Sequence, residues 1–189
     1  MNLSSRTLQV LKNFATINQS IVFKPGSQIK TMSTSKTILA KADVDCTFDK
    51  HFAIYDLSRF LSAVSLFDNP ELQTKEKYVE ITSGGEKLNY VYSDTSLIAS
   101  PPDKDIKLPS EDVQFVLTSD ILMKTQKALG VIGAPEVAFV GDGNAVYMEA
   151  LNSRDVSSSN YRVHLGDTEK TFKFIILPEN LKLLPGVIS

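Results

Sequence analysis

The residues best suited to chemistry in this sequence are lysines and arginines that fall on predicted helices. Lys124 and Lys127 are three residues apart, so they share one face of a helix. Lys12 and Arg59 lie outside the apolar stripes of their own helices. Cationic side chains in such positions bind the phosphate backbone of a nucleic acid without reading its base sequence.

The distribution of charge strengthens this interpretation. Six cations lie on the four predicted helices: Arg6, Lys12, Arg59, Lys124, Lys127 and Lys182. The three carboxylates of these helices all lie at the N-cap or in the first turn, where the helix dipole favours acids. The helices therefore have a net charge of +3, in a chain whose net charge is −2. Ordinary solvated helix faces are the alternative explanation, and the sequence leaves both open.

Motifs for catalysis, cofactors or metals are absent from the sequence. The segment Gly84-Gly85-Glu86-Lys87 lacks the upstream glycine of a phosphate-binding loop, and it fits a hairpin turn better. His51 and His164 are far apart and have no Cys or His neighbour that would complete a metal site. Cys46 follows a strand-like run and is expected to be packed. We therefore expect no enzymatic activity, no cofactor and no metal.

The composition is that of a globular protein. Hydrophobic residues make up 42% and charged residues 22% of 189 residues, which suffices for one large domain or two small ones. The sequence has no apolar run long enough to cross a membrane and no signal peptide, so no membrane partner is expected. The single cysteine fits a reducing cytoplasm.

Periodicity and turn residues predict an alternation of helices and strands. The predicted helices are 5–18, 57–67, 119–130 and a short last helix that begins at Pro178 and ends before Pro185. The predicted strands are 21–23, 28–32, 37–42, 78–82, 88–92, 96–99, 115–117, 136–140, 146–151, 161–165 and 172–177. Prolines and mixed charges over residues 101–112 indicate an extended linker.

The order of helix, strands, helix and strands occurs twice, which predicts two similar α+β domains, 1–100 and 113–189. Three strands follow the second helix in the first half, whereas only a few residues follow it in the second half. We expect the second domain to lack its C-terminal strands, through truncation by roughly 30–40 residues. An exposed sheet edge should result.

Several segments resemble a known family. The segments 11–18 and 52–57, together with Phe60-Leu61 and Ser65-Leu66, are similar to the sliding clamp of T-even-type bacteriophages. The segment 172–176, followed by Pro185-Gly186, resembles part of the second domain of that clamp. The resemblance implies a DNA-clamp fold, in which two domains per subunit each have antiparallel sheets packed on two helices. It also implies a homotrimeric ring whose helices face duplex DNA, in the cytoplasm of an infected bacterium.

Function and partners also follow from the resemblance. A clamp of this kind is a processivity factor that tethers a DNA polymerase, carries no ATPase and is opened by an ATP-dependent clamp loader. It also activates late transcription in T-even phages. Lys12 lies in the best-matching segment and is the first DNA-facing candidate, followed by Arg59, Lys124 and Lys127, and then by Arg6 and Lys182.

Two contact regions are expected on the same basis. The edge strand of the first domain that meets a neighbouring subunit should come from residues 78–99. A pocket for partner peptides is placed around Ile106 and Leu108. These two residues could instead only fix the linker to the sheet.

Two other functions fit the sequence. A two-domain protein-interaction scaffold without DNA binding would scatter its basic residues over several faces. An enzyme would require a deep pocket with converging carboxylates or histidines, which nothing in the sequence demands.

Overall fold

The computed structural model describes residues 1–102, 104, 110 and 112–184. The chain forms two compact units, Met1–Asp105 and Ile106–Ser189, and each is described by itself. The predicted linker lies mostly outside the described residues, so its boundaries remain a prediction.

The first unit begins with α1 (Ser5–Ile17), followed by β1 (Ile21–Phe23), β2 (Gly26–Met32), β3 (Leu39–Phe48) and β4 (Phe52–Ile54). Helix α2 (Leu57–Val64) comes next and leads to β5 (Glu71–Thr74), β6 (Tyr78–Ser83), β7 (Glu86–Val91) and the 3-10 helix η1 (Thr95–Leu97). All strand pairs are antiparallel: β1 with β4, β2 with β3, and the sheet β5-β6-β7.

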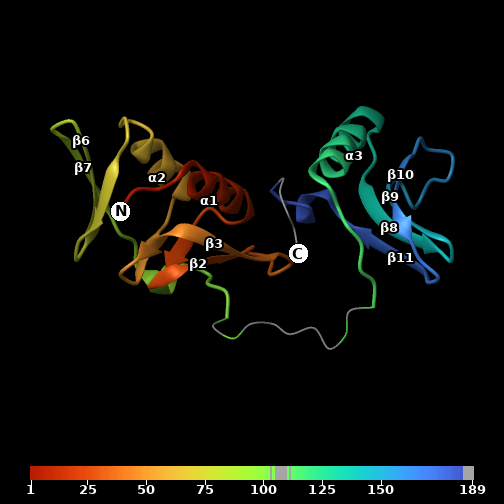
Figure 1. Ribbon diagram of the computed structural model, residues 1–189, viewed down its shortest axis with the longest axis horizontal. Helices are drawn as coiled ribbons and strands as arrows, with labels where there is room; N and C mark the ends of the chain where they lie inside the picture. The colour runs from red at the N-terminus through yellow and green to blue at the C-terminus, as the bar shows by residue number, and fades with distance from the viewer. Residues whose placement is uncertain (103, 105–109, 111, 185–189) are drawn as a thin grey trace. The chain divides into compact units, whose positions relative to one another are not determined.

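Helices α1 and α2 pack side by side, with α1 on the β2–β3 hairpin and α2 on β7 (Figure 1). Side-chain caps define where they begin: the Thr7 N–H donates to Ser4 Oγ at 3.0 Å, and the Arg59 N–H donates to Asp56 Oδ1 at 2.9 Å. Their apolar faces bury Leu11, Phe14, Leu57, Phe60 and Leu61. Burial of these side chains from water is the main force that fixes the helices on the sheets.

The second unit consists of α3 (Ser119–Ile132), β8 (Glu136–Asp142), β9 (Ala145–Leu151), β10 (Tyr161–Asp167), β11 (Thr171–Ile176) and the 3-10 helix η2 (Pro178–Asn180). The strands form one antiparallel sheet in the order β10-β9-β8-β11, and α3 packs on β9 and β10 (Figure 1). Leu122 and Leu129 of α3 pack against Val137, Met148 and Ala150 in the core.

The two units share one topology. In each, a helix is followed by four strands arranged in the order third, second, first, fourth. In the first unit β1 lies beside β2, but the pairs β1–β4 and β2–β3 form two separate sheets. Pro25, which has no N–H to donate, lies in the short connection between β1 and β2, and Gly26 begins β2 with φ of 123°.

The predicted fourth helix is wrong, because only the three-residue 3-10 helix η2 is present after Pro178. Leu181 leaves the helical region at φ −93° and ψ 47°. This turn buries the Leu181 side chain in the core and lets its carbonyl accept a hydrogen bond from Gln126 Nε2 at 3.3 Å. The described part of the second unit therefore contains a single α-helix.

Four details of the strand predictions also need correction. Residues 96–99 do not form a strand, because Asp94 caps η1 by accepting a hydrogen bond from the Ser96 N–H. Residues 115–117 pair with no described strand, although Phe115 stacks on Phe139 at 4.9 Å. Strands β4 and β5 were not predicted, since three and four residues are too few to reveal a period.

Candidate nucleic-acid interface

Lys12 lies at the centre of the solvent-exposed face of α1. Leu11 and Phe14 define the opposite, buried face, and no carboxylate occurs within Ser5–Ile17. Among the described residues Lys12 forms no ion pair, so its ammonium group is available to an external anion.

Arg6 belongs to the same helix but lies near the flank, where its charge faces β3. Asp45 accepts hydrogen bonds from Thr7 Oγ1 at 2.6 Å and Ser4 Oγ at 2.7 Å. These two bonds, with a smaller contribution from the Arg6 charge, hold the pKa of Asp45 below its usual value. Arg6 is therefore a weaker candidate for binding an external phosphate than Lys12.

Arg59 lies on the exposed face of α2, next to a surface hollow. The hollow has a volume of about 390 Å³ and is lined by Arg59 and Ala63 of α2 and by residues 88–91 of β7. Tyr90, one of these lining residues, has its ring edge-on to Phe60 at 5.1 Å and donates its hydroxyl to the Asp56 carbonyl at 3.1 Å. Arg59 thus borders a mainly apolar hollow as well as solvent.

Lys124 and Lys127 lie on the exposed face of α3, as their spacing predicts. Asp120 precedes Lys124 by one helical turn and occupies the first turn of the helix. Val131 and Met123, which are 75% and 50% exposed, lie on the same solvent-facing half. The face therefore combines two cations with two apolar side chains, and its one carboxylate lies at the N-terminal end.

The remaining predicted site residues are placed differently. Lys182 follows η2 and is half-buried, so it does not extend a basic helix face. Ile106 and Leu108, the predicted peptide pocket, lie outside the described residues. The structure brings Lys12 and Arg59 onto neighbouring helices and places Lys124 and Lys127 on one helix of the other unit.

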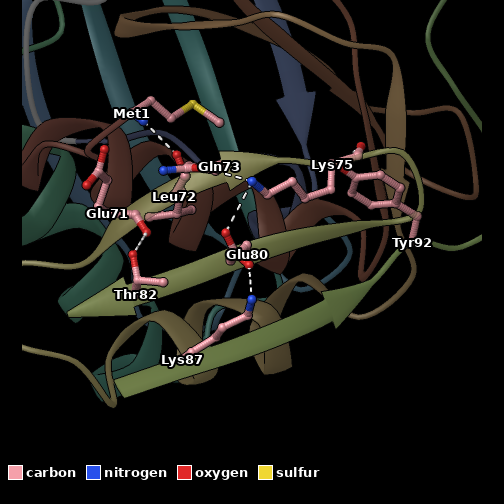
Figure 2. A network of polar contacts seen from close by, with 9 residues as sticks. All are labelled: Met1, Glu71, Leu72, Gln73, Lys75, Glu80, Thr82, Lys87 and Tyr92. Atoms are coloured by element: carbon pink, nitrogen blue, oxygen red, sulfur yellow. Dashed lines mark hydrogen bonds and ion pairs between the residues drawn. The ribbon is translucent and has the colours of Figure 1, made fainter. Parts of the chain in front are cut away.

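A polar network that the sequence analysis missed crosses the outer face of the sheet β5-β6-β7 (Figure 2). Glu80 on the central strand pairs with Lys75 at 3.2 Å and with Lys87 on the edge strand β7. Its side chain is only 12% exposed. Hydrogen bonds from Lys87 and then Lys75 lower the pKa of Glu80, and the bond to Glu80 raises the pKa of Lys87.

The second unit has a comparable pair. Arg162 on the edge strand β10 pairs with Glu149 on β9, directly opposite, and its guanidinium carbon lies 4.6 Å from the centre of the Tyr147 ring. The Glu149 side chain is also 12% exposed. The register of a two-residue hairpin could have revealed the Glu80–Lys87 pair. The long loop between β9 and β10 hides the second pair from sequence analysis.

The described residues contain no group of three or more His, Cys, Asp or Glu side chains that could hold a metal ion. Within the same residues, no helix is long and apolar enough to span a membrane. What the helix faces offer is a set of separate, solvated cations, which suits non-specific binding of phosphate groups.

Comparisons with known proteins identify the family of the chain. Residues 4–100 match the family model for the DNA polymerase processivity factor. The chain is 33% identical to the sliding clamp of Vibrio phage KVP40 over 97% of its own length and 86% of the relative. It is 30% identical to the sliding clamp of Enterobacteria phage T4, over 98% of its own length and 84% of the relative.

Solved structures with little sequence identity share the fold. The proliferating cellular nuclear antigen of Entamoeba histolytica superposes with a TM-score of 0.63 and 13% identity, over 93% of this chain and 78% of that one. The A. fulgidus PCNA, solved with the C-terminal region of FEN-1 bound, gives a TM-score of 0.64 and 15% identity, over 93% and 77%. These likenesses confirm the predicted α+β DNA-clamp fold.

Proposed function

The chain belongs to the sliding-clamp family of DNA polymerase processivity factors of T4-type phages, and we propose that it acts as one subunit of a homotrimeric ring around duplex DNA. The ring would tether the phage DNA polymerase to its template in the cytoplasm of the infected host. An ATP-dependent clamp loader would open it, because the clamp itself would contribute no enzymatic step.

The charge of the exposed helix faces is the observation that carries this proposal. Lys12, Arg59, Lys124 and Lys127 are exposed, and the three helices hold no carboxylate beyond the first turn. Such faces attract phosphates of any sequence, and separate weak contacts leave the protein able to slide. We assign these four residues to the DNA side of the ring, with Arg6 and Lys182 as lesser contributors.

The open edge of β7 supports the ring. A two-residue turn at Gly84-Gly85 makes Ser83 and Glu86 a hydrogen-bonded pair, so Leu88 and Tyr90 also bond to β6. The backbone groups of Lys87, Asn89 and Val91 therefore point away from β6, and no described strand pairs with them. We place the first-domain side of the subunit contact at this edge.

Asn89→Pro tests that contact, because proline removes an N–H that points away from β6 and should spare the β6–β7 ladder. We expect the wild-type chain to show the mass of three subunits in light scattering and the proline variant to show one. Asn89→Ala is the matched control and should remain trimeric. Retention of the trimer by the proline variant would exclude β7 as the contact.

The activity itself is tested by primer extension on a primed circular template with the phage polymerase, the clamp loader and ATP. Addition of the chain should lengthen the products that the polymerase makes each time it binds the primer. Linearising the template should abolish the gain, because a ring can slide off a free end. Equal gains on circular and linear templates would argue for a scaffold that binds polymerase without encircling DNA.

Co-activation of late transcription and a peptide pocket at Ile106 and Leu108 are further proposals. They rest on the resemblance of the whole chain to the sliding clamps of T-even-type phages. A transcription assay with the phage late promoter apparatus, with and without the chain, tests the first. Substitution of Ile106 and Leu108 by serine, followed by polymerase binding, tests the second.

A further inference from the structure

The exposed hydroxyl groups in the later turns of α1 and α2 bond back to their own helices. Ser62 Oγ donates to the Ser58 carbonyl at 2.9 Å, and Oγ of the C-cap residue Ser65 donates to the Ser62 carbonyl at 2.7 Å. In α1, Thr16 Oγ1 donates to the Asn13 carbonyl at 2.7 Å. These three side chains are exposed to solvent, yet each hydroxyl hydrogen is used within the helix.

This use of the hydroxyl hydrogens limits what the helices can offer to DNA. A hydroxyl group has one hydrogen to donate, and the non-bridging oxygens of a phosphodiester can only accept. A contact between Ser62 and a phosphate would therefore first break the bond to the Ser58 carbonyl. Because one hydrogen bond replaces another, the exchange adds little net affinity.

The positions of Ser62 and Thr16 place them next to the cations of the helix faces. Thr16 lies one turn after Lys12 in α1, so the two side chains share an exposed face. Ala63 lines the hollow beside β7, and Ser62 is turned from it by about 100° around the axis of α2. Ser62 therefore lies on the solvent side of α2, away from this hollow.

Helix α3 reaches the same result with other residues. Beyond the first turn its exposed neutral residues are Met123, Gln126, Gly130 and Val131. Among these only Gln126 has a side-chain donor, and its Nε2 donates to the Leu181 carbonyl at 3.3 Å. Lys124 and Lys127 remain as the side chains of this face that are suited to contact phosphate.

We infer that Thr16 and Ser62 are mobility-determining residues, by which we mean residues that keep the DNA-facing surface free of directed phosphate contacts. A hydrogen bond depends on distance and angle and would hold the protein at one position on the backbone. A charge is attracted from any direction and can pass from one phosphate to the next. This inference rests on the proposed ring and deepens it, because it names neutral residues that keep the contact with DNA weak.

The test measures binding of the full chain to a short linear duplex by fluorescence anisotropy across salt concentrations. Ser62→Ala removes the hydroxyl, and we expect the dissociation constant to stay within about twofold of the wild-type value. Ser62→Gln presents a neutral amide that extends beyond the helix backbone, and we expect it to tighten binding by about three- to tenfold. The slope of log K against log salt should stay at the wild-type value in both variants, because a neutral donor releases no counterion.

Sliding is measured on rings that the clamp loader has placed on circular DNA. The DNA is cut once, and the loss of labelled protein from the ends is followed with time. Ser62→Gln should slow this loss, whereas Ser62→Ala should leave it unchanged. Ser27→Gln, on the exposed part of β2, is the matched control for an added amide and should change neither measurement. Circular dichroism melting curves establish that every variant is folded.

The outcomes separate this inference from the proposed function. Weaker duplex binding by Ser62→Ala would show that the hydroxyl itself contacts DNA, and it would overturn the inference. Wild-type binding by Ser62→Gln would also overturn it, and would leave the role of the helix cations standing. A wild-type chain without salt-dependent duplex binding would overturn the proposed function and the inference together. Unchanged binding by Ser62→Ala with tighter binding and slower loss by Ser62→Gln supports both.

Discussion

The two units build the same strand order from different kinds of side chain. The first unit packs an aromatic group, in which Phe23 stacks on Phe52 at 4.8 Å and Phe52 stacks on Tyr92 at 4.8 Å. The corresponding strands of the second unit form one four-stranded sheet, in which the small residues Ala138 and Ala150 are fully buried. The comparison indicates that the topology depends on where apolar residues fall along the chain, and less on which apolar residues they are.

The largest expected effect on stability is at Gly141, because the packing of the second unit leaves no space for a side chain at this position. A Cβ atom there would lie 2.4 Å from the Phe172 ring and 2.6 Å from the Lys170 carbonyl oxygen. We expect Gly141→Ala to lower the free energy of unfolding by about 1–3 kcal/mol, because ring and backbone must both shift. Hydrogen exchange should lose protection in β8 and β11.

Gly130→Ala in α3 is the matched control for Gly141. Nothing lies within 4 Å of a Cβ atom at this helical position. Alanine should stabilise the helix by up to about 1 kcal/mol, as helix propensity predicts. Urea unfolding curves of both variants compare the two effects, and equal effects of the same sign would contradict the packing of Phe172 over Gly141.

The helix caps give a second, smaller contrast between the units. Ser4 Oγ accepts from the Thr7 N–H at 3.0 Å and donates to Asp45 at 2.7 Å, whereas Thr118 Oγ1 accepts from the Ile121 N–H at 3.4 Å. We expect Ser4→Ala to cost about 1–2 kcal/mol and Thr118→Ala about 0.5 kcal/mol of stability. Chemical denaturation measures both, and a greater loss for Thr118→Ala would reverse the comparison.

The same caps explain how much of the fold the sequence could predict. Ser4, Asp56 and Thr118 let the three α-helices be placed to within a residue at their starts, because a side-chain acceptor before an apolar stripe is a local feature. The end of η2 could not be predicted, since Leu181 turns to fill a core that distant strands build.

The residues of the candidate site likewise fall into those that the sequence could place and those that it could not. Lys12, Lys124 and Lys127 could be placed on exposed helix faces, because helical spacing alone decides this. The hollow beside Arg59 and the pair Arg162–Glu149 depend on which strands become neighbours, and in what register. Neither is encoded in any local pattern, so both required the structure.

Acid should affect the first unit through Asp45, which accepts a hydrogen bond from the N-cap Ser4 of α1. The folded pKa of Asp45 is lowered, so its contribution to stability is present above its unfolded pKa and is lost as the pH falls through the lower folded value. We expect the stability of the wild type to decline below roughly pH 4 relative to that of Asp45→Asn. Thermal melts of both proteins between neutral pH and about pH 3 measure the difference. If the melting temperatures of the two proteins change in parallel with pH, Asp45 does not contribute to the pH dependence of stability.

The smallest expected effect compares the exposed cations of the helices. Binding of a short linear duplex, followed by fluorescence anisotropy across salt concentrations, gives the slope of log K against log salt. Lys12→Gln and Lys127→Gln should each reduce the magnitude of that slope by about 0.9, because each removes one phosphate contact. Arg59 borders the hollow at the β7 edge, so Arg59→Gln should change the slope less and self-association more. Glu86→Gln should leave the slope unchanged. If Arg59→Gln instead lowers the slope as much as Lys12→Gln and leaves self-association unchanged, Arg59 belongs with the DNA-binding cations. Arg59 would then make no contribution to self-association.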